Sequence, residues 1–360
     1  MTTIISRNTT PALRLRAGAT ALHKIREHGL SPALVSHLAA AAGGPKWLIL
    51  GRLEQQLFGH WLRQSDQPVR LIGASIGAWC MASAAQTNPV AGLQHFEEVY
   101  LSQRYGEKTT AAMINAECER LLEEFLTDQV IAEILANPRY QLSVITMRCT
   151  GALGSDRRVP LLWGLAKLIL YNSISRGLMG RAAERVIFHT GSPIAMRPDG
   201  IPTHFVQASA QNLRAAVMAS GMLPLFMLGM RDIPGAPAGT YRDGGTLDYH
   251  MDLPLKEDDG IVLLPHFFEG VTAGWFDRML PWRGPVNLAN TLMVIPSNEL
   301  LARLPHQRVP SRKDFYEFAG RDEERLRIWH IALGEAQRMA DEWGELAASG
   351  RLEERLEPLE

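Results

Sequence analysis

A serine stands between two glycines in the string Gly73-Ala74-Ser75-Ile76-Gly77, and the segments on either side of it have different periodicities. Residues 69–72, which follow Pro68, form a short and mostly apolar run that predicts a strand, whereas residues 76–86 have helical spacing. A strand that turns directly into a helix at a G-x-S-x-G string is the setting of a nucleophile elbow, in which the serine occupies a strained turn. The small residues around Ser75 leave room for such a turn.

The segment before this unit has the same order of elements. Residues 33–42 form an Ala-rich apolar run that predicts a buried strand, Gly43-Gly44-Pro45 predicts a tight loop, and residues 47–62 have helical spacing. Two strand-loop-helix units in succession predict parallel strands joined by right-handed crossovers. Further strands are expected at 141–147, 185–189, 204–207 and 260–264, with helices at 91–137, 212–220 and 322–345. We therefore expect an α/β fold with a mostly parallel central sheet, and a peripheral helical insertion at about 91–137.

The amino-acid composition is typical of a globular protein. Of its 360 residues, 46% are hydrophobic and 21% charged, which allows a substantial core. Lys and Arg number 37 against 38 Asp and Glu, so there is no electrostatic reason to expect nucleic acid, and a small-molecule or interfacial substrate fits better. Because no long Ser/Gly/Pro linker interrupts the chain, we expect one main domain over residues 1–310, with a C-terminal helical extension at 311–360 packed on it.

The three cysteines, Cys80, Cys118 and Cys149, are widely spaced, which favours reduced thiols in a cytoplasmic protein over a disulfide framework. They form no pair with metal-ligand spacing. The basic segment 1–30, which includes Arg7, lacks the apolar stretch of a secretory signal. An organelle presequence is the rival interpretation, but the helix signals favour a first helix at 17–28.

The longest apolar stretch, residues 159–171, is interrupted by Gly164 and Lys167 and is too short to cross a membrane. Two interpretations are open. A buried helix explains it, and so does an apolar lip that meets a lipid surface as a peripheral contact.

The predicted position of Ser75 at a helix N-terminus has a chemical consequence. Unpaired amides there stabilise negative charge on a substrate oxygen, and the Ile76 amide is the natural first donor. The alternative is a plain turn with Ser75 as N-cap. Gly43 and Gly44 would let further amides approach a ligand, although the same segment could be a simple strand-end turn.

Lys46 follows these glycines and could hold the loop, meet an anionic head group or be solvated. A nucleotide-binding reading of Gly43-Gly44-Pro45-Lys46 is disfavoured, because the segment has neither the G-x-G-x-x-G nor the G-x-x-x-x-G-K-[ST] spacing.

A third motif is the turn Tyr241-Arg242-Asp243-Gly244-Gly245, preceded by the run 213–226 that contains Ala219, Ser220 and Pro224. Taken in order with the two glycine-containing motifs, it makes residues 33–265 resemble the patatin-like phospholipases. The resemblance implies a three-layer α/β/α fold and a hydrolase of lipid or small acyl esters that needs no cofactor and no metal.

The same resemblance implies a role for each motif. Ser75 would be the nucleophile and Asp243 its only general base, through an acyl-enzyme intermediate. Gly43, Gly44 and Ile76 would supply the oxyanion hole. The supporting positions would be Gly73, Gly77, Lys46, Gly244 and Gly245.

Two departures from the family pattern define an alternative. Ala41 and Ala42 stand where the family has an acidic residue and a glycine, and Trp47 stands where a glycine usually follows the basic residue. The stretch between Asp243 and its next proline, Pro254, is also longer than expected. A catalytically weak or inactive scaffold with this fold is therefore a second reading.

A Ser-His-Asp esterase is the third reading, since the order serine, acid, histidine is met by His250 and His266. Neither histidine lies in a distinctive turn, so we expect both to be structural or surface residues. Asp248 lacks the glycine neighbours of Asp243, and we rank it below Asp243 as the base.

Overall fold

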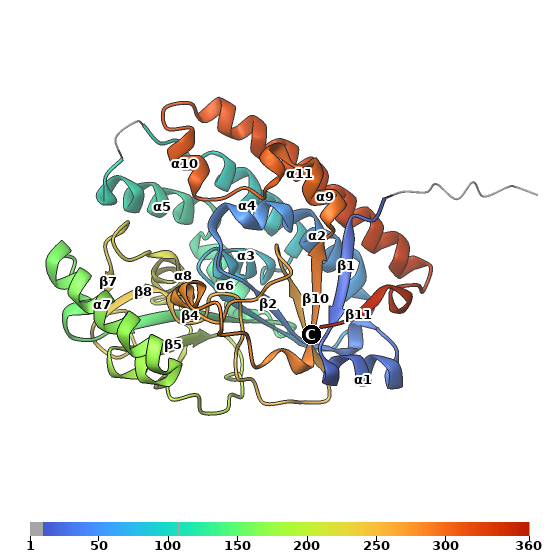
Figure 1. The fold of residues 1–360 in the computed structure, drawn as a ribbon, viewed down its shortest axis with the longest axis horizontal. Coiled ribbons are helices and arrows are strands. Elements are labelled where there is room, and N and C mark those ends of the chain that lie inside the picture. Colours follow the sequence, from blue (N-terminus) through green and yellow to red (C-terminus); the bar gives the residue numbers. More distant parts are fainter. Residues whose placement is uncertain (1–9, 107–108, 360) are drawn as a thin grey trace, which may run out of the picture.

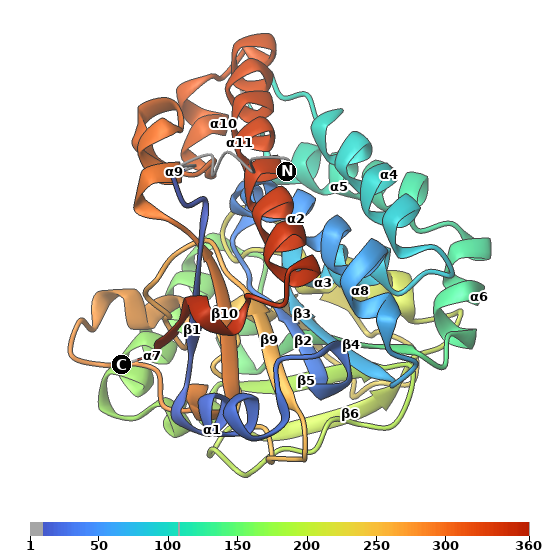
Figure 2. The same ribbon diagram turned by 90° about the vertical axis from the view of Figure 1, so that its right-hand side faces the viewer.

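The computed structural model describes residues 10–106 and 109–359, so Arg7 and the start of the basic segment lie outside the described residues. These residues form an α/β fold around one mixed sheet with the strand order β11-β1-β10-β9-β2-β3-β4-β5-β6 (Figures 1 and 2). The short strands β7 and β8 join it beside β4. The strand bounds are β1 Leu13–Ala17, β2 Val35–Ala40, β3 Val69–Ala74, β4 Tyr140–Cys149, β5 Ala183–His189, β6 Thr203–Gln207, β7 Met230–Arg231, β8 Thr240–Asp243, β9 Ile261–Pro265, β10 Thr291–Pro296 and β11 Leu356–Pro358.

The centre of the sheet is parallel. Strands β10, β9, β2, β3 and β4 run in the same direction, as Figure 2 shows, whereas β1, β5 and β8 are antiparallel to their neighbours β10 and β4. Alternate side chains of the central strands enter two separate clusters: Ile261 and Leu263 of β9 join one, Val262 and Leu264 the other. Both faces are therefore buried, which is the usual state of a parallel sheet.

Helices flank this sheet. Their bounds are α1 Ala19–His28, α2 Gly51–Gln56, α3 Ile76–Ala84, α4 Pro89–Leu101, α5 Ala111–Phe125, α6 Asp128–Ala136, α7 Arg158–Ile174, α8 Leu213–Gly221, α9 Asn298–Arg303, α10 Lys313–Glu317 and α11 Asp322–Ala348. On one face α3 packs on β2, β3 and β4, α8 packs on β4 and β8, and α11 packs along α2. On the other face, segments without regular structure contribute Ile194, Tyr249, Met251 and Leu253, and α7 covers one end. The predicted α/β class, with a mostly parallel central sheet flanked by helices, is confirmed.

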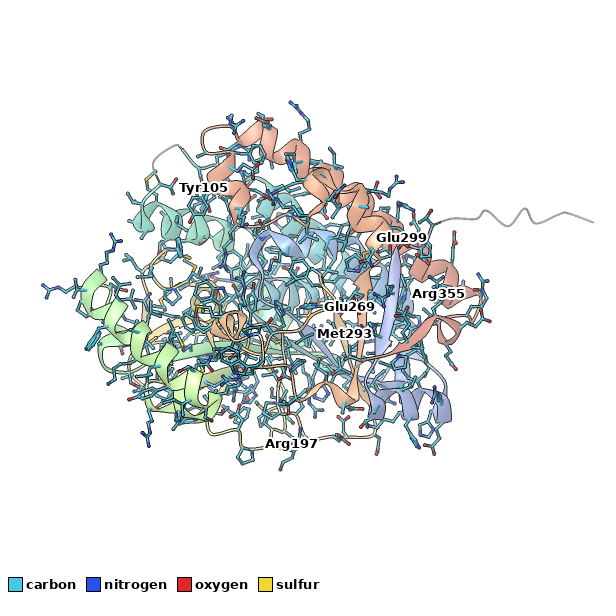
Figure 3. The ribbon with its side chains drawn as sticks, in the orientation of Figure 1. Tyr105, Arg197, Glu269, Met293, Glu299 and Arg355 are labelled. Atoms are coloured by element: carbon cyan, nitrogen blue, oxygen red, sulfur yellow. The ribbon has the colours of Figure 1, made fainter. Side chains whose placement is uncertain are left out.

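Segments from both ends of the described chain meet at one edge of the sheet. Strand β1 pairs with β10 and with β11, so residues 13–17 lie beside residues 291–296 and 356–358. Arg14 forms ion pairs with Glu269 and Glu357. The labelled side chains Glu269, Met293 and Arg355 in Figure 3 come from this side of the molecule. The division of the chain at residue 310 stays a prediction.

The predicted elements were mostly found, with three differences. Residues 44–64 are helical but irregular, because the 3₁₀ turns Gly44–Ile49 and Leu62–Gln64 and the π-helical turn Leu57–Trp61 surround α2. Strands β1, β7, β8, β10 and β11 were not predicted from the sequence. Helix α7 is only half buried, which corrects the buried-helix interpretation of 159–171, since Val159 and Trp163 are exposed. No helix among the described residues is long and apolar enough to cross a membrane.

Candidate active site

Ser75 occupies a sharp turn between β3 and α3. Its backbone has φ 56° and ψ −131°, a conformation that non-glycine residues rarely adopt and that is strained. The turn leaves no space for side chains around it: a Cβ placed on Gly77 would lie 2.1 Å from the Ala40 carbonyl oxygen, and one on Gly73 would lie 2.4 Å from the Gly77 carbonyl oxygen. The glycines flanking Ser75 therefore allow the backbone segments to approach each other, and the serine is held where the strand meets the helix.

The Ser75 hydroxyl donates a hydrogen bond to Oδ2 of Asp243, with Oγ and Oδ2 2.8 Å apart. Strand β4 brings the two residues together. Ala74 of β3 pairs with Ile145, and Asp243 of β8 pairs with Thr146, the next residue of β4. Because β5 occupies the other edge of β4 over residues 143–149, β3 and β8 follow one another along the same edge. Residues 168 positions apart in sequence thereby become neighbours.

Asp243 is held by its backbone and by both carboxylate oxygens. Its amide donates to the Met222 carbonyl oxygen at 2.9 Å, and its Oδ1 accepts the Gly245 amide at 2.7 Å. Burial raises the pKa of Asp243 to about 6, although Arg312 and the hydrogen bonds from Ser75 and Gly245 act in the opposite direction. A carboxylate with such a pKa can accept a proton near neutral pH more readily than an exposed aspartate.

Ser220 of α8 holds the Ser75 backbone. Its Oγ accepts the Ser75 amide at 2.9 Å and donates to the Ile145 carbonyl oxygen at 2.7 Å. The hydroxyl thus links α8, the elbow and β4. Because the Ser75 amide is bonded to it, that amide is not available to a substrate. Sequence reasoning placed Ser220 in a characteristic run but did not assign it this contact.

The three glycine-containing motifs converge around the pair. Gly77 packs against the end of β2 at Ala40, and a Cβ on Gly245 would lie 2.5 Å from Cβ of Ala42. Gly244 and Gly245 form a 3₁₀ turn with Thr246 directly after Asp243. Gly44 has a φ of 57°, in the left-handed region that favours glycine.

Among the described residues, the amides of Gly43, Gly44, Ile76 and Gly77 have no hydrogen-bond acceptor. The Ile76 and Gly77 amides begin α3, so they lie at the positive end of its dipole. These amides are free to bind an anionic oxygen.

Lys46 lies inside an aromatic cluster. Its Nζ donates to the Tyr249 hydroxyl at 3.1 Å and lies 4.8 Å from the ring centre of Phe267 and 4.7 Å from that of Phe268. Burial, together with the nearby Arg278 and Arg312, lowers the pKa of Lys46 to about 7. The solvated-lysine interpretation is therefore wrong. Trp47, which follows it, points into the core and packs 4.9 Å from Phe96 between ring centres.

The two candidate histidines are buried next to each other, 4.4 Å apart between ring centres. Burial lowers the pKa of His266 to about 4 and lowers that of His250 well below the usual value. Nδ1 of His266 contacts the Phe268 carbonyl oxygen at 2.6 Å, and Nδ1 of His250 accepts the Thr272 amide at 3.1 Å. The Ser75 hydroxyl bonds Asp243 without a histidine between them.

Asp248 is buried in a separate ion-pair network. Its carboxylate accepts hydrogen bonds from Arg185 at 2.7 and 2.9 Å and from Arg176 at 2.9 Å. It is therefore engaged by two cations and does not contact Ser75.

Arg312, which the sequence did not single out, lies close to Asp243 and Gly44. Its Nη2 lies 3.9 Å from Oδ2 of Asp243, and its Nε lies 3.2 Å from the position of a Cβ on Gly44. Because Arg312 precedes α10, far along the chain from either motif, no local sequence signal points to this contact.

Ser75 and Asp243 lie below the surface, with 3% and 1% of their area exposed. The surface hollows at α1 and around His37 and Asp258 do not reach them. In the part of the chain that the structure describes, no group of three or more His, Cys, Asp or Glu side chains is arranged to hold a metal ion.

Comparison with known proteins gives a distant structural likeness. No protein-family model matches the chain, and no curated protein matches its sequence. The crystal structure of the type III effector protein ExoU is similar at a TM-score of 0.27 and 12% sequence identity, over 86% of this chain and 54% of the ExoU chain. This chain thus spans about half the length of that protein. Because the likeness is so distant, the chemistry of the site rests on its own residues.

Proposed function

We propose that this chain is a serine acyl-ester hydrolase that uses Ser75 as nucleophile and Asp243 as general base. The observation that carries the proposal is the 2.8 Å hydrogen bond from the Ser75 hydroxyl to Asp243, made by a serine in a strained turn at a helix N-terminus. A serine hydroxyl needs a base within hydrogen-bond reach to attack an ester. A carboxylate whose pKa is about 6 meets that need near neutral pH.

The reaction would proceed in two steps. Ser75 Oγ attacks the carbonyl carbon of the ester while its proton passes to Asp243. The carbon–oxygen bond to the alcohol then breaks, the proton goes to the leaving alkoxide, and an acyl-serine remains. In the second step water attacks this ester and gives its proton to Asp243; the bond from carbon to Oγ breaks, the proton returns to Ser75, and the carboxylic acid leaves.

Both steps place negative charge on the former carbonyl oxygen. The free amides of Gly43, Gly44 and Ile76 are the donors that we assign to it, since each donor of this kind contributes roughly 3 to 4 kcal/mol where one has been removed by mutation. The Ser75 amide is not among them, because it is bonded to Ser220.

We further propose that the hydrolase is of the patatin-like type, acting on lipid or small acyl esters. The support is the order of the motifs along the chain together with a Ser–Asp pair that involves no histidine.

An ester panel with four variants tests the proposal. We expect Ser75→Ala and Asp243→Asn to lose p-nitrophenyl ester hydrolysis by about 10²-fold or more, as the loss of a nucleophile or general base does. His250→Gln and His266→Gln should each retain it. Loss of hydrolysis in a correctly folded histidine variant, with activity kept in Asp243→Asn, would support a Ser-His-Asp mechanism instead.

An inactive scaffold is the competing function, and the 3% exposure of Ser75 favours it, because a substrate reaches a buried Oγ only when the groups around it move. Labelling with a fluorophosphonate probe separates the two. Covalent labelling of the wild type, absent in Ser75→Ala, supports the hydrolase. An unlabelled wild type that hydrolyses no ester in the panel supports the scaffold.

A further inference from the structure

Helix α7 exposes one apolar face. Val159, Leu162, Trp163, Leu170 and Ile174 recur at helical spacing, and their exposed fractions are 78%, 44%, 69%, 58% and 67%. The opposite side of the helix is buried through Leu161, Gly164, Leu165 and Leu168. Side chains of α7 project outward at the left edge of the molecule in Figure 3, where the helix lies in Figure 1. We call the five exposed residues the α7 face.

A neighbouring loop is attached to the buried side of the helix. Asn172 of α7 donates to Asp277 at 2.7 Å and accepts from Arg283 at 2.9 Å, so the segment 277–283 is fixed to the helix. That segment carries two more exposed apolar side chains, Met279 and Trp282, with exposed fractions of 55% and 74%. Five exposed apolar side chains gathered on one face of a helix indicate a site of interaction.

The charged side chains of α7 and its N-cap all have one sign. The helix contains no Asp or Glu, and its exposed cations are Arg158 and Lys167, with Arg157 as its N-cap. Within the described part of the chain, none of these three forms an ion pair. A second copy packed face to face would bring like charges together, whereas an anionic surface would neutralise them.

We propose that the α7 face binds the surface of an anionic lipid bilayer, with the helix lying in the plane of the interface. Exposed apolar residues flanked by Arg and Lys are the composition of interfacial helices, and tryptophan is favoured at the boundary between head groups and acyl chains. Trp163 supplies such a side chain on the α7 face. The inference does not depend on catalysis by Ser75.

Co-sedimentation with vesicles tests it. We expect the full-length chain to bind vesicles of equal parts phosphatidylcholine and phosphatidylserine, and to bind pure phosphatidylcholine more weakly. The double variant Trp163→Ser/Leu170→Ser should lower the affinity for anionic vesicles by about tenfold or more, because it removes apolar area that the bilayer would bury. Ile331→Ser is the matched control, since Ile331 is an exposed apolar residue of α11, away from the α7 face.

A charge variant and an inactive variant complete the test. Arg158→Gln/Lys167→Gln should weaken binding to anionic vesicles and reduce its salt dependence. Ser75→Ala should bind as the wild type does. The proposal is overturned if the wild type does not sediment with anionic vesicles, or if the Trp163/Leu170 variant, folded by circular dichroism, binds them equally well. It is also overturned if light scattering shows a dimer that this variant abolishes, because a second copy would then cover the face.

Discussion

Nη2 of Arg312 lies 3.9 Å from Oδ2 of Asp243, the oxygen that accepts the Ser75 hydroxyl. The cation favours the charged carboxylate and so offsets part of the effect of burial on the Asp243 pKa. Arg312 is half-buried and also lies against Gly44 of the loop to which we assign oxyanion donors. One side chain from the C-terminal part of the chain thus contacts both the proposed base and the proposed oxyanion loop.

Replacing Arg312 by glutamine should move the pH dependence of hydrolysis. The base works only when it is deprotonated, so the rate should rise with pH through the Asp243 pKa, which is about 6. Without the guanidinium that pKa rises, and the acidic limb of the kcat/KM profile should move to higher pH. Lys313→Gln, at the exposed next position, is the control and should leave the limb in place. A limb that stays fixed in Arg312→Gln would show that the two groups are not coupled.

Ser220→Ala should slow catalysis without removing any group that reacts. The substitution leaves the Ser75 amide and the Ile145 carbonyl oxygen without their partner, at a cost of about 1 to 3 kcal/mol in the free energy of unfolding. If Ser220 positions the elbow, kcat should fall while KM changes little.

Ser83→Ala provides the matched control for Ser220. Ser83 is also fully buried, but its hydroxyl donates to the Trp79 carbonyl oxygen of its own helix, at 3.0 Å. This variant should leave kcat near that of the wild type. Equal kcat values for the two alanine variants would reduce Ser220 to a structural role.

The elbow could be predicted because its signals are local: a strand, a turn of small residues and a helix follow one another within residues 69–86. The adjacency of Ser75 and Asp243 was predicted only through the family resemblance, because it depends on β8 pairing with β4 beyond the end of β3. Strand β10 had a readable signal, an apolar run bounded by Asn290 and Ser297, that the sequence analysis did not use.

Other features depend on partners far apart in sequence. In β1, Arg14 and Arg16 alternate with leucines, which in the sequence gives a basic segment. In the structure, Glu269 and Glu357 form ion pairs with these arginines. The contact between Arg312 and Asp243 is of the same kind. The apolar stretch 159–171 predicted an apolar helix or lip, but which face of α7 stays exposed depends on the 3₁₀ turns at 151–154 and 176–181 on which it packs.

Gly77→Ala should abolish the fold of the elbow. Its Cβ would lie 2.1 Å from the oxygen and 2.6 Å from the carbon of the Ala40 carbonyl group, and backbone atoms cannot move aside as a flexible side chain can. We expect a loss of about 3 kcal/mol or more in unfolding free energy, or an insoluble product. Gly334→Ala in α11 is the opposite control, since no atom lies within 4 Å of its Cβ, and it should stabilise the protein by up to about 1 kcal/mol. Two equally stable variants would contradict the close approach of β2 and the elbow.

The raised pKa of Asp243 has a consequence for stability. The ordinary value is 3.8 and the folded value is about 6, so the folded state holds the proton more tightly than the unfolded state does. The contribution of Asp243 to the unfolding free energy therefore falls as pH rises from about 4 to about 6, and the charged carboxylate costs about 3 kcal/mol above that range, at about 1.4 kcal/mol per pKa unit. The proposed base is thus a source of instability at neutral pH.

Asp243→Asn should remove this cost, because an amide keeps the size of the carboxylate and can bond both Gly245 and Ser75 without carrying charge. Urea unfolding at several pH values in this range measures the difference in unfolding free energy between the variant and the wild type. That difference should change in favour of the variant as pH rises. Any effect of the substitution that does not depend on pH leaves this change unaffected. Asp248→Asn is the control: its carboxylate is bound by Arg176 and Arg185, so the substitution should destabilise the protein at neutral pH by leaving buried cations poorly paired. A gap between Asp243→Asn and wild type that does not change with pH would mean that burial leaves the pKa of Asp243 near its ordinary value.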